Sequence, residues 1–357
     1  MKNKYVFLLI TSLLCLHLAA QQGADPDSYK KKKKSEKLYN DGIKRVLEQD
    51  YYSALFYFDS AVLIRPDFAK AINERGKIFF SKERYSDAIM EFEKASDLDP
   101  NFGEAYFNLA FSMFVKDLHL LRQDSLTVSS ADFDNAIIHG FAAPQGYYYR
   151  GLMKHLEGDI EGAAADYSIA LELNSEYPKA YHDRGTAKNM LGDFQGAIYD
   201  YRLSVTYDAG LIQGYINMGD AKRQIGDYQG AERDYTLAIN LDTTSFIAYN
   251  NRGGTRLTLA NVDGAADDFA KAYELNPESV EIISNMGSIE YNKGNYEGAI
   301  DWFNQAIGLD EKYAPAILNR GLTFELQGML QEACADWQMA AELGIEQANT
   351  YLKECKE

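Results

Sequence analysis

Five arginines in this sequence each have an acidic residue sixteen positions further along the chain. Arginine presents a planar fork of N–H groups that matches the two oxygens of a carboxylate, so this spacing predicts five ion pairs. Such pairs specify packing more than they add stability, and we interpret them as structural contacts between helices. The pairs are Arg75–Glu91, Arg150–Asp166, Arg184–Asp200, Arg252–Asp268 and Arg320–Asp336.

The other residue types that carry chemistry form no catalytic or metal-binding pattern. The histidines that follow the N-terminal leader do not have the spacing of a metal site. Nucleophile motifs, phosphate-binding loops and metalloprotease signatures do not occur. We therefore expect no catalytic, cofactor-binding or metal-binding residues, and no enzymatic activity. These histidines are His119, His139, His155 and His182.

The ion pairs belong to a 34-residue repeat, which is clearest from Ile212 to Ser245. The eighth place is small and the 24th is aromatic in nine copies, which predicts a repeat protein. Successive eighth places are 34 residues apart, except for 41 between Ala110 and Gly151. The eighth places are Gly42, Gly76, Ala110, Gly151, Gly185, Gly219, Gly253, Gly287 and Gly321. The 24th places are Phe58, Phe92, Phe133, Tyr167, Tyr201, Tyr235, Phe269, Phe303 and Trp337.

Each copy is interpreted as two helices, because apolar residues recur at three- and four-residue spacing on both sides of a turn. The turn carries pairs such as Gly226-Asp227, and glycine adopts the left-handed conformation that ends a first helix. The arginines fill the seventh place and the acids the 23rd. Pairing with the 23rd place of the preceding repeat would put Arg75 opposite Tyr57 and Arg320 opposite Trp302. Pairing within one repeat fits better.

With these small and aromatic places, the sequence from Ser35 to Glu346 resembles the tetratricopeptide repeat family. The resemblance implies an all-α, right-handed superhelical solenoid of nine antiparallel helix pairs. A charged C-terminal helix over 346–356 is expected to cap the last repeat, which has no neighbour to cover it. The predicted divisions are a signal peptide at 1–20, a flexible polar and basic linker at 21–34, repeats at 35–345 and the capping helix at 346–357.

The resemblance also implies a concave groove, lined by first helices, that holds segments of other proteins. The predicted function is thus a non-enzymatic protein–protein interaction scaffold whose partners are proteins or peptides. Asparagine at the sixth place either hydrogen-bonds the backbone of a bound peptide or stabilises the repeat itself. The candidate groove residues are Phe107, Asn108, Phe111, Phe114, Tyr148, Asn217, Asn251, Asn285 and Asn319.

The third repeat departs from the pattern by an insertion of seven residues near 116–128. The insertion either lengthens the helices or forms a protruding loop, and local decay of one repeat is the alternative. Phe107, Phe111 and Phe114 form a stripe on one face of the preceding helix. The stripe is either core or a site covered by a hydrophobic peptide anchor or by the insertion folded back.

The N-terminus has the layout of a secretory signal peptide, with Lys2 and Lys4 before an apolar run that ends at Ala19-Ala20. The apolar run is too short for a lone transmembrane anchor. The favoured expectation is export to the periplasm or beyond, with cleavage after Ala20. Lipidation at Cys15 is the alternative, and it would make the protein a membrane-tethered assembly or secretion accessory factor.

The formal charge of the 357-residue chain is −17, and removal of the two leader lysines makes it −19. Nucleic acid and anionic lipid would repel so acidic a chain, so neither is expected as a partner. The lysine run from Lys30 to Lys34 is interpreted as a solvated helix face or a disordered arm, with a docking patch for an acidic partner as the alternative.

Cleavage would leave two cysteines, Cys334 and Cys355, near one end of the chain. An even pair in an exported protein suggests a disulfide. If the helices that carry them run antiparallel, both cysteines lie at the same end of the pair. The alternative is one buried thiol and one in a frayed terminus.

Overall fold

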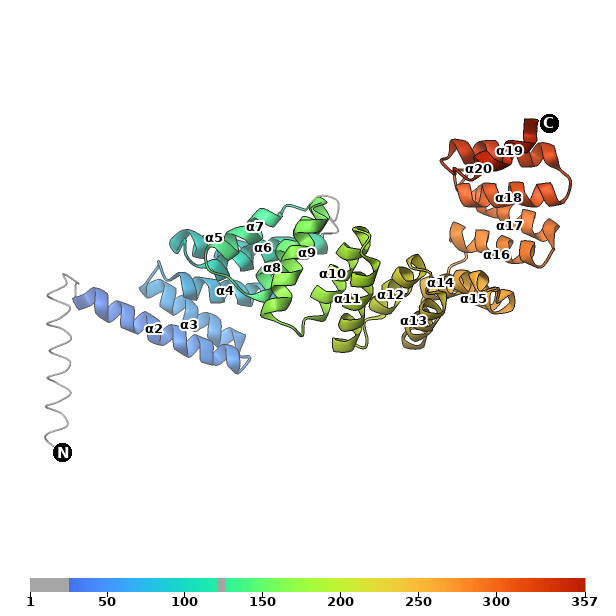
Figure 1. Ribbon diagram of the computed structural model, residues 1–357. Coiled ribbons are helices and arrows are strands. Elements are labelled where there is room, and N and C mark those ends of the chain that lie inside the picture. Colours follow the sequence, from blue (N-terminus) through green and yellow to red (C-terminus); the bar gives the residue numbers. More distant parts are fainter. Residues whose placement is uncertain (1–25, 121–125, 357) are drawn as a thin grey trace. The chain divides into compact units, whose positions relative to one another are not determined.

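The computed structural model describes residues 26–120 and 126–356, and all regular secondary structure in them is helical. The chain divides into two compact units, Met1–Ser175 and Glu176–Glu357. Within each unit the helices form antiparallel pairs that follow one another in chain order (Figure 1). The predicted all-α repeat architecture is confirmed, with four helix pairs in the first unit and five in the second. The predicted signal peptide lies outside the described residues.

The helix bounds reproduce the repeat period. The first unit contains α2 (Pro26–Leu47), α3 (Tyr51–Ile64), α4 (Ala69–Ser81), α5 (Tyr85–Leu98), α6 (Gly103–His119), α7 (Ser130–Ile138), α8 (Pro144–Glu157) and α9 (Ile160–Leu173). The second unit contains α10 (Pro178–Met190), α11 (Phe194–Tyr207), α12 (Ile212–Gln224), α13 (Tyr228–Leu241), α14 (Phe246–Thr258), α15 (Val262–Leu275), α16 (Val280–Asn292), α17 (Tyr296–Leu309), α18 (Ala314–Leu326), α19 (Leu330–Glu342), α20 (Ala348–Tyr351) and the 3₁₀ turn η2 (Glu354–Lys356).

The turn inside each repeat is built by two adjacent residues with different tasks. Gly226 ends α12 with a φ of 79°, a conformation that residues with a Cβ rarely adopt. Asp227 then caps α13, because its side chain accepts a hydrogen bond from the backbone N–H of Gly230 at 2.9 Å. In the Gly-Asp pair predicted to mark the turn, the glycine therefore ends the first helix and the aspartate begins the second.

The core of a repeat is the contact between its two most regular places. The ring of Tyr235 is fully buried and lies against the backbone of Gly219, where a Cβ would approach ring atom Cε1 to 2.7 Å. The other eighth-place glycines face the 24th-place ring of their own repeat in the same way. Glycine is needed here because the ring occupies the space that a side chain would fill.

The segment expected to be a flexible linker at 21–34 is helical from Pro26 onward, so the prediction is wrong for residues 26–34. Proline suits the first turn of a helix, and Asp27 carries a favourable charge there. Lysine is also a good helix former. Because all five lysines of the run are exposed, they extend α2 beyond the repeat without needing a packing partner.

The insertion in the third repeat lengthens one helix and shortens the other. Helix α6 has 17 residues where α12 has 13, and α7 has nine where α13 has 14. Buried Asp117 holds the returning chain, since its Oδ2 accepts hydrogen bonds from the N–H and the hydroxyl of Thr127 at 2.7 Å each. The insertion is therefore fastened to the helix that it follows.

The C-terminal cap is shorter than the helix expected over 346–356. It consists of α20 and η2, separated by a turn, because a segment this short does not sustain α-helical hydrogen bonding by itself. Ala348 is buried in the last repeat, and the Tyr351 ring stacks on Trp337 with 5.3 Å between centroids. Cys334 and Cys355 form a disulfide with their Cα atoms 5.8 Å apart.

We predict opposite effects for two glycine substitutions that differ only in their surroundings. Gly219→Ala should destabilise the protein by about 1–3 kcal/mol, because the new methyl group displaces the buried Tyr235 ring. Gly254→Ala adds a methyl group to α14 where nothing lies within 4 Å, and should stabilise by about 0.4–1 kcal/mol. Thermal unfolding followed by circular dichroism measures both; equal shifts would contradict the packing described.

We predict that protein purified from an oxidising compartment without reductant has no titratable Cys334 or Cys355 thiol in denaturant, and two after reduction. Cys355→Ser should leave one thiol and lower the stability of the last repeat by about 2–4 kcal/mol, because the disulfide constrains the unfolded terminus. Two free thiols in the unreduced protein would show that the pair is not bonded.

Candidate protein-interaction site

The five predicted ion pairs all have the fork geometry that the residue types suggest. Arg320 donates from Nε to Asp336 Oδ2 at 2.8 Å and from Nη2 to Oδ1 at 2.7 Å. Asp336 is nearly inaccessible to solvent, so the fork replaces water that the carboxylate loses on folding. The same two-pronged contact joins Arg75 to Glu91, Arg150 to Asp166, Arg184 to Asp200 and Arg252 to Asp268.

Pairing within one repeat, as predicted, is confirmed, and contacts with the preceding repeat add to it. Four of the arginines use Nη1 to reach the 25th place of the preceding second helix, not the 23rd place that the sequence argument considered. The contacts are Arg75–Asp59, Arg150–Asp134, Arg252–Thr236 and Arg320–Asn304. Each of these arginines therefore joins three helices, because its fork leaves one nitrogen free after binding a carboxylate.

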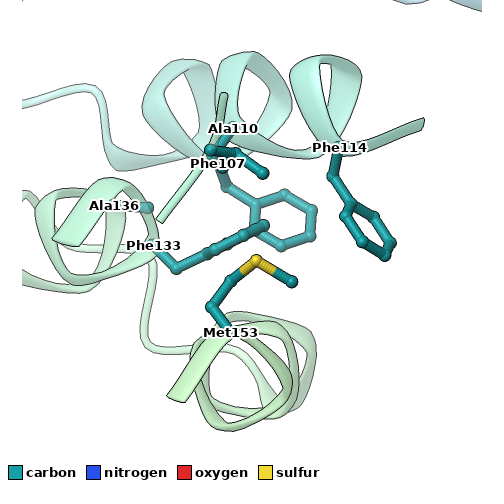
Figure 2. Packing of buried hydrophobic residues seen from close by; sticks show 7 residues of the cluster. Phe107, Ala110, Phe114, Phe133, Ala136 and Met153 are labelled. Carbon is teal, nitrogen blue, oxygen red and sulfur yellow. The ribbon is translucent and has the colours of Figure 1, made fainter. Parts of the chain in front are cut away.

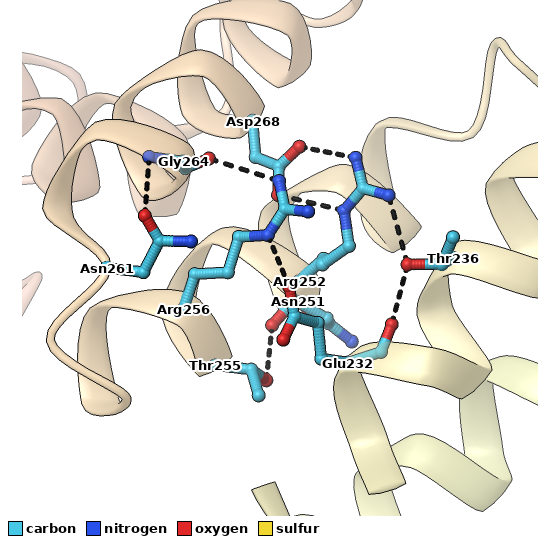
Figure 3. A network of polar contacts seen from close by, with 9 residues as sticks. All are labelled: Glu232, Thr236, Asn251, Arg252, Thr255, Arg256, Asn261, Gly264 and Asp268. Atoms are coloured by element: carbon cyan, nitrogen blue, oxygen red, sulfur yellow. Dashed lines mark hydrogen bonds and ion pairs between the residues drawn. The ribbon is translucent and has the colours of Figure 1, made fainter. Parts of the chain in front are cut away.

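A second cation reaches the same carboxylate in several repeats. Figure 3 shows Arg252 and Arg256 both directed at Asp268, with Arg256 also bound to Glu232 of the preceding repeat at 2.7 Å. Lysine occupies this eleventh place in three other repeats, in the pairs Lys154–Asp166, Lys188–Asp200 and Lys222–Asp234. The sequence analysis missed this cation, although its spacing of twelve residues from the acid is regular.

The sixth repeat shows what the arginine contributes, because Met218 replaces it there. Asp234 is buried and keeps the ion pair with Lys222, at 2.6 Å. Burial raises the pKa of Asp234, and the lysine opposes that shift only in part. The buried carboxylates are thus structural charges that need cations.

Most sixth-place asparagines are engaged with the preceding first helix. Asn108 donates to Asn73 Oδ1 at 3.0 Å, and Asn285 donates to Asn250 Oδ1 at 2.8 Å. Two more contacts of this kind follow, Asn217 with His182 Nε2 at 3.1 Å and Asn251 with Asp220 at 3.0 Å. These four side chains stabilise the stacking of repeats, which was one of the two expected roles.

Asn319 differs from the other four. It holds the sixth place of the last repeat, in α18, but its side-chain amide has no hydrogen-bond partner among the described residues. It lines a cavity of about 230 Å³ together with Ser288, Tyr291 and Leu322. Burial raises the pKa of Tyr291, so its hydroxyl stays neutral and able to donate.

The phenylalanine stripe of α6 divides into core and surface. Phe107 and Phe114 are buried in a cluster with Phe133 and Met153 (Figure 2), and Tyr148 is also buried. Val128 of the insertion belongs to the same cluster, and Leu126 packs against it. The stripe is therefore core: Phe141 stacks on Phe107 with 4.3 Å between ring centroids, Tyr149 lies 4.9 Å from Phe111, and the returning end of the insertion adds apolar side chains to the same cluster.

Phe111 is the half-buried member of the stripe and lines a cavity of its own. This cavity of about 210 Å³ lies between α4 and α6 and is also lined by Phe80, Asn108 and Lys77. Phe111 and Phe80 lie 5.5 Å apart between ring centroids. In the repeat numbering, Phe80 and Phe111 correspond to Tyr291 and Leu322 of the other cavity. The two units thus carry equivalent apolar pockets with an asparagine beside each.

Other types of site are absent from the part of the chain that the structure describes. Within 26–120 and 126–356, no group of three histidine, cysteine or acidic residues is placed to hold a metal ion. A search of those same residues finds no helix that is both long and apolar enough to span a membrane. Each unit therefore has a candidate site on its first helices, the pocket at Phe111 in the first unit and the pocket at Leu322 in the second.

Comparison with known proteins identifies the repeats. A model described as TPR repeat matches residues 76–115 and 287–328, and one described as Tetratricopeptide repeat matches 212–244. Over 81 residues the chain is 30% identical to Small glutamine-rich tetratricopeptide repeat-containing protein 2 of Mycosarcoma maydis, a match that covers 23% of each protein. The matched part is thus under a quarter of that relative's length.

Two solved structures share the fold over most of this chain. The crystal structure of the APC/C hetero-tetramer Cut9-Hcn1 aligns with a TM-score of 0.55 and 16% identity over 87% of this chain and 60% of that one. A tetratricopeptide repeat protein from Parabacteroides merdae aligns with a TM-score of 0.50 and 16% identity over 80% of this chain and 97% of that one. At these identities the likeness concerns the fold alone.

We predict that Arg320→Ala lowers the free energy of unfolding by about 3 kcal/mol, because Asp336 has no other cation within ion-pair distance among the described residues. The double variant Arg320→Ala/Asp336→Ala should recover part of this loss, since it removes the unpaired carboxylate. Lys271→Ala, which breaks the exposed pair with Glu274, is the control and should cost under about 0.5 kcal/mol. An unchanged thermal transition for Arg320→Ala would contradict the structural role.

Proposed function

Because the chain is a tetratricopeptide repeat protein, we propose that it is a non-enzymatic scaffold that binds segments of partner proteins along its first helices. The observation that carries this proposal is the pair of equivalent pockets, one between α4 and α6 and one beside α18. Each pocket is large enough for one apolar side chain. Both are open on the surface formed by consecutive first helices.

The pocket chemistry suits an extended polypeptide. Phe80 and Phe111 in one unit, and Tyr291 and Leu322 in the other, offer apolar walls for an anchoring side chain. The unpartnered amide of Asn319 can donate to a peptide carbonyl and accept from a peptide N–H, so it recognises backbone whatever the side chains. An apolar pocket beside a free amide is the usual means of holding a peptide with modest sequence selectivity.

Export remains part of the proposal. The apolar leader suggests secretion, and the bond between Cys334 and Cys355 suits an oxidising compartment such as the periplasm or the cell exterior. A scaffold in that setting would meet partner proteins of the cell envelope.

A selection of random peptides displayed on phage, carried out on the purified protein, tests the proposal. Selected peptides should bind Leu322→Asp or Phe111→Asp about ten to a hundred times more weakly, because a buried charge replaces an apolar contact of about 1.5–3 kcal/mol. Tyr199→Asp and Met90→Asp are matched controls, since both residues are exposed on second helices.

The milder variants Leu322→Ser and Phe111→Ser cover the case in which an aspartate prevents folding. Circular dichroism melts establish that each variant is folded before binding is measured. If no peptide is enriched, or if enriched peptides bind the pocket variants as well as they bind the controls, the first-helix pockets are not the binding site.

A further inference from the structure

The distribution of charge sets one helix apart from the rest of the chain. Helix α2 carries eight basic and three acidic residues, a net charge of +5. Residues 48–357 carry 26 basic and 49 acidic residues, a net charge of −23. The basic residues concentrate in the run Lys30–Lys34, which precedes the first repeat and is exposed on every side. Because α2 is cationic while the rest of the chain is acidic, its lysine run can attract an anionic partner.

Arg65 stands beside this helix and lacks the contacts that the repeat arginines have. Its buried Nε has no hydrogen-bond partner among the described residues. The nearest carboxylates are Glu36, at 3.8 Å from Nη1, and Asp67, at 4.0 Å from Nε, both too far for a hydrogen bond. The guanidinium instead lies over the ring of Phe68, with Cζ 3.4 Å from the ring centroid. Stacking fixes its orientation, and neither Nη atom donates a hydrogen bond to a described residue.

Two open pockets meet at Arg65. One of about 580 Å³ also contacts Lys32, Lys70 and the rings of Tyr39 and Phe68. The other, of about 490 Å³, contacts Lys31, Lys32 and the end of α3 at Ile64. The side chains of Lys31, Lys32 and Lys70 make no ion pair with any described residue, whereas Glu36, Asp67 and Asp99 supply the acidic part of the lining. In the larger pocket the three basic and three acidic lining residues balance, and the excess of positive charge comes from Lys31 and the rest of the lysine run.

We propose that this surface, formed by Lys31, Lys32, Arg65, Lys70, Tyr39 and Phe68, binds a short acidic polypeptide segment of a partner protein. The free donors of Arg65 suit a carboxylate, and the lysines supply further charge-assisted contacts. Half-buried Tyr39, which packs against the buried ring of Phe68, gives an aromatic wall for a side chain between the acidic ones. The surface is separate from the first-helix pockets at Phe111 and Leu322, so this inference goes beyond the proposed function.

The partner is expected to be short because the rest of the chain, residues 48–357, is strongly acidic. A membrane surface or a nucleic acid is an extended anion that would also face the −23 of residues 48–357. A short acidic segment can lie along the lysine run and Arg65, and most of the acidic remainder is screened because at physiological ionic strength charges beyond about 8 Å interact weakly. A free inorganic anion would make no use of the aromatic wall. An acidic peptide uses all the groups that are present.

A fluorescein-labelled peptide with five glutamates on each side of one phenylalanine tests this inference by fluorescence anisotropy. The wild-type protein should bind it, and salt should weaken the binding. Lys32→Gln and Arg65→Gln should each weaken it about tenfold, since each removes a charge-assisted contact. Lys44→Gln, an exposed lysine on the same helix that lines neither pocket, should bind as wild type does.

Three further measurements separate this surface from its alternatives. Phe111→Asp should bind the acidic peptide unchanged, which distinguishes the surface from the first-helix pockets. Replacing the phenylalanine of the peptide by serine should weaken binding, and about 10 mM inorganic phosphate should not compete beyond its ionic strength. Absence of binding, equal binding by Lys32→Gln and Lys44→Gln, or tighter binding to phosphatidylglycerol vesicles than to the peptide would overturn the proposal.

Discussion

The structure depends on one recurrent contact, an aromatic ring packed against the backbone of a glycine in the facing helix. In the sixth repeat Tyr235 lies so close to Gly219 that a Cβ would overlap its ring. This contact sets the distance between the two helices of a repeat. Protein interiors are packed so densely that a change in this distance would create a clash or a void. Where the third repeat has Ala110 in the glycine's place, the insertion and the shortened α7 follow nearby. Regular stacking and the glycine–ring contact therefore occur together.

The arginine network adds orientation to this packing. A ring against a glycine fixes how close two helices lie, but it does not prevent one from sliding along the other. The fork of Arg252 on Asp268, with its third contact to Thr236, fixes the rotation of three helices at once. Because the carboxylates are buried, misalignment leaves a charge without a partner and is costly. The network thus favours one register more than it adds stability.

The places where the pattern fails are where the surface becomes available for binding. Asn319 has lost the partner that Asn285 has, and its amide faces a pocket instead of a neighbouring repeat. Arg65 lies outside the seventh place and has no carboxylate within hydrogen-bond distance. In both cases a polar group that has a partner in the regular repeats has no hydrogen bond to a described residue, and the two proposed binding surfaces lie there. Binding surfaces in a repeat protein arise in this way from small departures in an otherwise satisfied scaffold.

The sequence by itself determined the period, the helix pairs, the small and aromatic places and the five arginine–acid pairs, because all of these involve residues at fixed separations within one unit. Only the tertiary structure showed that Arg320 also reaches Asn304 across a repeat boundary, since that contact depends on how the units stack. The same reason explains why Phe107 and Phe114 proved to be core, while Phe111 lines a pocket. Helical periodicity places the three on one face, but the neighbours decide which of them water reaches.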